Sequence, residues 1–136
     1  MPWLRGHARR ARCGLLPRRG YAAGLIGRAL VAAALGSGHR RIARDLAVAA
    51  GTVRGWIRGA RRSAAQLRIT GIRTVAALDQ DALPARVRPD ELGCALEHLG
   101  AAASVLGRRF GLQHTSPWAR INVLTRGHLL AMAPAG

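Results

Sequence analysis

Apolar residues recur at helical spacing along most of the chain. One stripe begins at Tyr21 and stops at Gly36-Ser37-Gly38, a second spans residues 39–47, and a third begins at Thr52. The first stripe is made of Leu25, Ile26, Ala29, Leu30, Ala33 and Ala34. No run of four or more residues alternates convincingly between apolar and polar side chains, as a half-buried strand would. The pattern therefore predicts an all-α fold.

The third expected helix, over residues 52–62, has two faces of opposite character. Its apolar side chains are Val53, Trp56, Ile57 and Ala60, and its arginines are Arg54, Arg58, Arg61 and Arg62. The pattern permits an extension to Leu67 or Arg68. Thr70-Gly71 then separates this helix from a shorter helical segment over residues 72–78.

The second half contains the most regular apolar stripe. It consists of Leu92, Ala95, Leu96, Leu99, Ala103, Leu106 and Phe110. Acids at residues 90–91 and arginines at residues 108–109 match the helix dipole at the two ends, and Gly111 follows. Ser116-Pro117 is a cap and first-turn pair for a last helix over residues 118–126. The sequence thus predicts two or three further helices after residue 68.

The charge of the chain is large and unevenly distributed. The 136 residues suffice for one domain, and 22 basic residues against 6 acids give a net charge of +16. Every basic residue is arginine, a bias that a GC-rich coding sequence explains. Residues 1–68 hold 15 arginines and one acid, whereas residues 69–136 hold 7 arginines and 5 acids. We therefore expect a polyanion as the partner, bound by the first half.

The first 20 residues have no sustained helical or strand period and are rich in arginine. We expect a basic N-terminal arm over residues 1–20, which either contacts the polyanion or is only a solvated tail. Arg18-Arg19 before an apolar stretch looks like a leader, but Arg28 lies within that stretch. No run approaches the roughly 20 apolar residues that a membrane span needs. The sequence predicts a cytoplasmic, nucleoid-associated protein without membrane contact.

Side chains that could carry chemistry are few. Cys13 and Cys94 are too distant and too few for a four-ligand zinc site, so no metal or cofactor is expected. The acids of the second half fall in a loop and at a helix end, where acids commonly cap and solubilise. The acids that could be considered for a metal-dependent nuclease centre are Asp79, Asp81, Glu91 and Glu97. The sequence predicts a protein that is not an enzyme and has no evident small-molecule substrate.

The segment from His39 to Ile57 resembles a helix-turn-helix of the homeodomain-like kind found in insertion-sequence transposases and bacterial regulators. The matching residues are Gly38-His39-Arg40-Arg41-Ile42-Ala43-Arg44-Asp45-Leu46 and Thr52-Val53-Arg54-Gly55-Trp56-Ile57. We expect a buried contact between the two helices, with the small Ala43 where they cross. It would be formed by Ile42, Leu46, Val53 and Trp56. The resemblance implies a three-helix unit over residues 21–68 and a supporting or dimerising helical region over residues 69–136.

Such a motif places its second helix in the major groove of DNA. The resemblance therefore implies that helix 52–62 reads bases, and Arg54 is suited to span guanine O6 and N7. The expected base-reading residues are Thr52, Arg54, Gly55 and Arg58. The expected phosphate-binding residues are Arg40, Arg41, Arg44, Arg61 and Arg62.

The turn of the motif departs from the usual pattern. Ala47 stands where similar motifs have glycine, and Ala49-Ala50 stands where they have a Ser-Pro-like helix start. The left-handed turn residue and the N-cap are thus missing, and a lost cap costs about 0.5 to 2 kcal/mol. We expect either a less sharply defined turn or a copy of the motif that drifts under weak selection.

A wider resemblance covers almost the whole chain. The residues that carry it are Leu15-Leu16-Pro17-Arg18-Arg19, the core from Gly38 to Trp56, Ser116-Pro117-Trp118 and Leu124-Thr125-Arg126-Gly127. They look like an uncharacterised family of high-GC bacterial proteins that carry a helix-turn-helix. A zinc-ribbon-like cysteine segment commonly precedes the Leu-Pro-Arg stretch in that family. The resemblance implies that this chain begins partway through the segment, with His7 and Cys13 as its remnant.

Together these patterns predict a sequence-specific protein that binds double-stranded DNA. It would act as a transcriptional regulator or as the DNA-recognition part of a mobile element, and homodimerise through the helix over residues 92–110. The alternatives are a structural RNA-binding or nonspecific nucleic-acid-binding protein and a fragment of a transposase.

Overall fold

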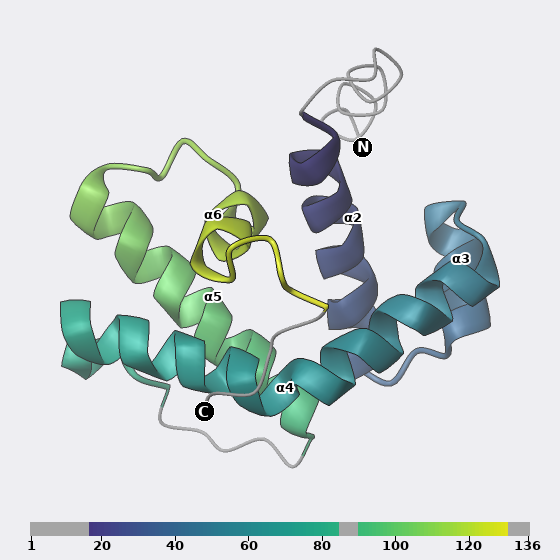
Figure 1. Cartoon of the computed structure of the whole chain (residues 1–136), viewed down its shortest axis with the longest axis horizontal. Helices are drawn as coiled ribbons and strands as arrows, with labels where there is room; N and C mark the ends of the chain where they lie inside the picture. The colour runs from purple at the N-terminus through teal and green to yellow at the C-terminus, as the bar shows by residue number, and fades with distance from the viewer. Residues whose placement is uncertain (1–16, 85–89, 131–136) are drawn as a thin grey trace.

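The computed structural model describes residues 17–84 and 90–130 (Figure 1). Within these ranges the chain is all-helical, which confirms the predicted fold class. The helices are α2 (Pro17–Ala34), α3 (His39–Leu46), α4 (Ala50–Leu78), α5 (Glu91–Phe110) and α6 (Pro117–Leu124), with a 3-10 helix η1 (Gln80–Ala82) after α4.

The first helix begins earlier than the sequence predicts. α2 starts at Pro17, four residues before the expected start at Tyr21. Proline suits the first helical position because its fixed φ is helical and its missing N–H would have no partner there. The last four residues assigned to the N-terminal arm are therefore helical, and the other sixteen lie outside the described residues.

α4 is a single helix of 29 residues, about 43 Å long at 1.5 Å per residue. The break predicted at Thr70-Gly71 is wrong. Gly71 is buried against α5, and a Cβ there would lie 2.7 Å from the carbonyl carbon of His98. The glycine permits close approach of two helices and does not end one.

α4 forms the base on which α2, α3 and α5 pack. It runs along the lower side of Figure 1, contacting α2 and α3 towards one end and α5 at the other. α6 contacts both α2 and α5. One core cluster joins these helices, and its largest fully buried members include Leu30, Ile42, Val53, Leu67, Leu92 and Leu99. The basic first half and the nearly neutral second half therefore share one hydrophobic core.

The ends of α5 and α6 follow the predicted capping residues. The Asp90 carboxylate accepts a hydrogen bond from the Gly93 amide at 3.1 Å, and Gly111 ends α5 with a φ of 66°. The Ser116 hydroxyl accepts from the Ala119 amide at 3.1 Å. α6 ends at Leu124, two residues before the predicted end.

Candidate nucleic-acid interface

The turn between α3 and α4 is closed by backbone hydrogen bonds. Ala47 has φ 55° and ψ 45°, so an alanine occupies the left-handed position where glycine was expected. The Val48 amide donates to the Ala43 carbonyl at 2.9 Å, and the Ala47 amide donates to the Arg44 carbonyl at 3.3 Å. This is a Schellman arrangement, which satisfies carbonyls at a helix end. The expectation of a loosely defined turn is wrong.

α4 begins at Ala50, two residues before the predicted start. Its N-cap is Ala49, whose side chain accepts no capping hydrogen bond. The first helical bond runs from the Val53 amide to the Ala49 carbonyl at 3.1 Å. The start of α4 therefore lacks a side-chain oxygen that could accept a hydrogen bond from the amides of its first turn, as the sequence indicates.

The predicted contact between α3 and α4 is present. Ile42, Ala43 and Val53 are at most 5% exposed and belong to the core cluster. Leu46 and Trp56 are half-buried and pack against that cluster. Close packing at Ala43 fixes the N-terminal part of α4 against α3.

All nine residues expected to contact DNA are exposed. The solvent side of α4 carries Thr52, Arg54, Gly55, Arg58, Arg61 and Arg62. The solvent side of α3 carries Arg40, Arg41 and Arg44. Within the described residues, none of these arginines forms an ion pair with an acid. Their guanidinium groups are thus available to an external anion.

The basic face of α4 is longer than the sequence predicts. Arg68, at the limit of the extension that the sequence permits, is also exposed. So is Arg73, because the helix continues through residues 70–71. Residues 46–78 contain no acid at all. From Arg54 to Arg73 the exposed arginines extend over about 28 Å at 1.5 Å per residue. The helical period could have placed Arg73 on this face only if the helix had been expected to continue past Thr70-Gly71.

Some of these arginines share a hollow with residues that the sequence reading missed. Arg54, Arg58 and Arg61 line a surface hollow of about 540 Å³ together with His39. Its other lining residues are Ala33, Gly36, Ser37, Gly38 and Ile57. The structure thus brings together two expected base-reading residues, one expected phosphate-binding residue and the loop before α3. Arg40, Arg41, Arg44 and Arg62 do not line the hollow.

The acids weighed as a catalytic centre lie apart from this surface. Asp79 forms an exposed ion pair with Arg108, with 3.7 Å between the oxygen and nitrogen atoms, and Glu91 lies in the first turn of α5. Across the described ranges, no three His, Cys, Asp or Glu side chains are grouped so as to hold a metal ion. Nor is any helix there long and apolar enough to cross a membrane.

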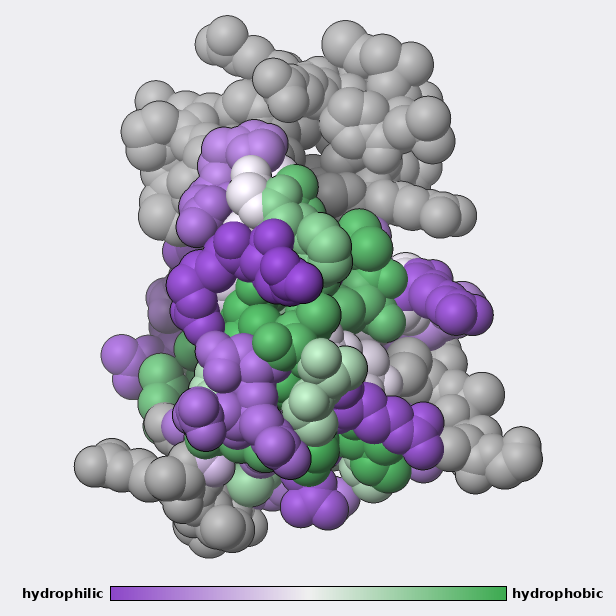
Figure 2. All heavy atoms as spheres, turned by 90° about the vertical axis from the view of Figure 1, so that its left-hand side faces the viewer, coloured by the Kyte–Doolittle hydropathy of each residue, from purple (hydrophilic) through white to green (hydrophobic). Residues whose placement is uncertain are grey.

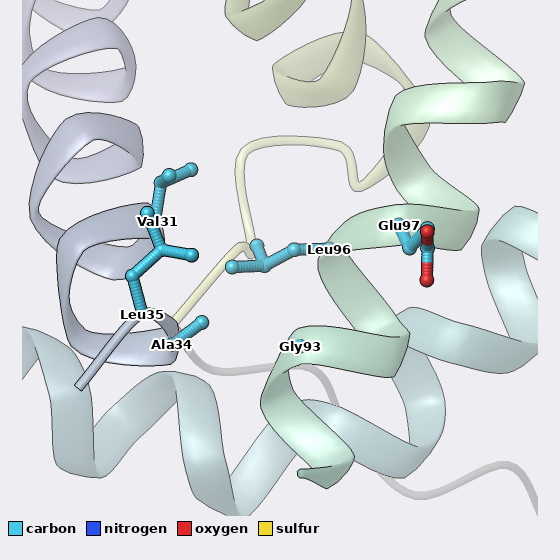
Figure 3. A pocket seen from close by; sticks show the side chains of 6 residues that line it. All are labelled: Val31, Ala34, Leu35, Gly93, Leu96 and Glu97. Carbon is cyan, nitrogen blue, oxygen red and sulfur yellow. The ribbon is translucent and has the colours of Figure 1, made fainter. Parts of the chain in front are cut away.

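The helix expected to mediate dimerisation directs most of its apolar stripe inward. Leu92, Leu99 and Ala103 are buried in the core, whereas Phe110 at its end is 60% exposed. The side of the molecule that faces left in Figure 1 shows apolar surface between hydrophilic side chains (Figure 2). A second hollow, of about 180 Å³ and largely apolar, lies between α2 and α5, where Val31 and Leu35 face Leu96 (Figure 3).

Comparison of the chain with protein families, with curated proteins and with solved structures finds no match.

Proposed function

We propose that this chain binds double-stranded DNA through a homeodomain-like helix-turn-helix formed by α3, the turn at Ala47 and the first turns of α4. The supporting observation is that packing at Ile42, Ala43 and Val53 fixes α4 while leaving its arginine-bearing side open. One α-helix fits the major groove of B-DNA, and arginine is the commonest reader of guanine there. The protein would act as a transcriptional regulator or as the recognition component of a mobile element.

The proposed roles divide along α4. Thr52, Arg54, Gly55 and Arg58 would contact base edges, and the arginines of α3 with Arg61 and Arg62 would bind phosphates. Gly55 is exposed, and a Cβ built on it would meet no atom within 4 Å. Its missing side chain therefore serves no internal packing and leaves room for DNA to approach the helix backbone.

The test is selection from a random duplex library at several salt concentrations, followed by sequencing of the retained DNA. We expect one enriched element, and a log-log slope of affinity against salt near −0.9 per neutralised phosphate. Binding without enrichment would identify a nonspecific protein. Tighter binding to structured RNA than to duplex DNA at equal salt would select the RNA-binding alternative.

A matched pair of variants locates the interface. Arg54→Ala should weaken binding to the enriched element by roughly tenfold to a hundredfold and relax preference at one base position. Arg109→Ala removes the same charge from an exposed position on α5 and should change affinity less than about twofold. Equal losses in both variants would show that net charge, and not α4, carries the binding.

A further inference from the structure

The hollow beside α4 has the composition of an anion site with an apolar floor. Ala33 and Ile57, at the base, are 7% and 8% exposed. Arg54, Arg58 and Arg61 line it from α4, and no acid is among its lining residues. A volume of about 540 Å³ lies within the roughly 300 to 1,000 Å³ typical of small-molecule sites.

The three arginines come from one stripe of α4. Their spacing of four and then three residues places them on the same helix face, one above the other. Like charges on one face repel, and arginine remains protonated throughout the physiological pH range. A polyanion in the hollow would relieve that repulsion and match the planar donor groups of guanidinium.

Another part of the hollow borders the start of α3. It is formed by the loop from Gly36 to Gly38 and the start of α3 at His39. No side chain caps α3, and the amides of residues 39–41 have no acceptor within the described residues. Free amides and the positive end of the helix dipole favour an anion at this position.

Gly38 keeps this helix end open without being required by the backbone. Its φ of −75° is accessible to every residue, and a Cβ built on it would meet no atom within 4 Å. Serine or aspartate at this position would cap α3 and stabilise it. The fold therefore has room for a capping side chain, and glycine leaves the start of α3 uncapped where Gly38 and His39 line the hollow.

We propose that the hollow is a binding site for a small molecule that bears a diphosphate group. A phosphate monoester carries about −1.5 to −2 charges at neutral pH, so two linked phosphates match three guanidinium groups better than one does. The ligand would occupy Arg54 and Arg58, which the proposed function assigns to DNA. Ligand and DNA would then exclude each other. This exclusion rests on the proposed function, whereas the existence of the small-molecule site does not depend on it.

Inorganic pyrophosphate is the probe for the test, and thermal unfolding of the full chain is the readout. At about a hundred times its Kd, pyrophosphate should raise the Tm by roughly 10 °C. Gly38→Asp caps α3 and raises the Tm without ligand, but its carboxylate should abolish the shift caused by pyrophosphate. Ala49→Asp is the matched control, since it adds the same charge at the uncapped start of α4, outside the hollow, and should keep the shift.

The outcomes separate the two proposals. A pyrophosphate shift that Gly38→Asp abolishes and Ala49→Asp keeps establishes the site, even if duplex DNA does not bind. If DNA binds but pyrophosphate gives no shift, the arginines of the hollow serve DNA alone and the small-molecule site is refuted. An equal shift in wild type and Gly38→Asp also overturns it. Competition should appear as weaker DNA binding with pyrophosphate than with sodium chloride of equal ionic strength.

Discussion

The two halves of the molecule differ at the N-terminal starts of their helices. In the second half, the side chains of Asp90 and Ser116 cap the starts of α5 and α6. In the first half, Gly38 and Ala49 precede α3 and α4 without a capping hydrogen bond, and α3 ends at an alanine in left-handed geometry. The first half thus lacks two side-chain caps that the second half has. Left-handed residues do not separate the halves, because Ala47 follows α3 and Arg126 follows α6 with nearly the same φ, 55° and 53°.

The missing caps lower the stability of the first half, and they occur in the half that carries most of the positive charge. Each missing cap costs about 0.5 to 2 kcal/mol, and left-handed geometry costs an alanine about 1 kcal/mol or more. The shared core lets the first half tolerate these losses, because Ile42 and Val53 are buried with residues of α5. The uncapped helix starts are next to exposed arginines, where anions gain most from free amides. Side-chain caps are found where charge is low, and uncapped helix starts are found where charge is high.

The largest expected effect contrasts two glycines of α4. Gly71→Ala should lower the free energy of unfolding by about 2 kcal/mol, because its Cβ would meet the backbone of His98 at 2.7 Å and the backbone cannot rotate away. Gly55→Ala should raise it by up to about 1 kcal/mol, because alanine favours helix and the site is open. Urea denaturation measures both. A stabilising Gly71→Ala would mean that α4 and α5 do not approach closely there.

A second pair of variants tests the caps directly. Asp90→Ala should lower the free energy of unfolding by about 1 kcal/mol through loss of the bond to the Gly93 amide. Ala49→Ser should raise it by a similar amount, because it supplies the missing cap of α4. Thermal and urea unfolding should agree in sign for each. Equal and opposite shifts would confirm that the two halves differ by capping, and a neutral Ala49→Ser would show that the start of α4 is satisfied in another way.

Local signals in the sequence were sufficient for α5 and for the caps of α5 and α6. The stripe from Leu92 to Phe110 and the caps at Asp90 and Ser116 depend on neighbours within one or two turns, so the ends of α5 followed. Gly71 was misread because a glycine that breaks a helix and one that admits a neighbouring helix look alike in sequence. The partner of Gly71 is His98, 27 residues away, and only the fold reveals it.

The sequence predicts the arginines of the candidate site but not the loop that lies beside them. Helical period placed Arg54 and Arg58 on the exposed face of α4. The sequence marks Gly36-Ser37-Gly38 as the end of a helix and Gly38 as the start of the motif, but not as part of a binding site. The approach of this segment to Arg61 depends on how α2 and α3 pack on α4, which no local pattern encodes.

The smallest expected effect concerns the turn between α3 and α4. Ala47→Gly should raise the free energy of unfolding by about 0.5 to 1 kcal/mol. Relief of left-handed strain outweighs the greater freedom that glycine gives the unfolded chain. Ala65→Gly is the control, since Ala65 is exposed within α4 and its replacement should cost up to about 1 kcal/mol.

If Ala47→Gly stabilises the fold and leaves DNA affinity unchanged, the alanine is a tolerated defect in a turn whose geometry the Val48 bond and the core enforce. If it weakens DNA binding instead, the rigidity that alanine gives the turn helps to hold α4 for recognition. A destabilised Ala47→Gly would contradict the left-handed geometry, because only there does glycine outperform alanine.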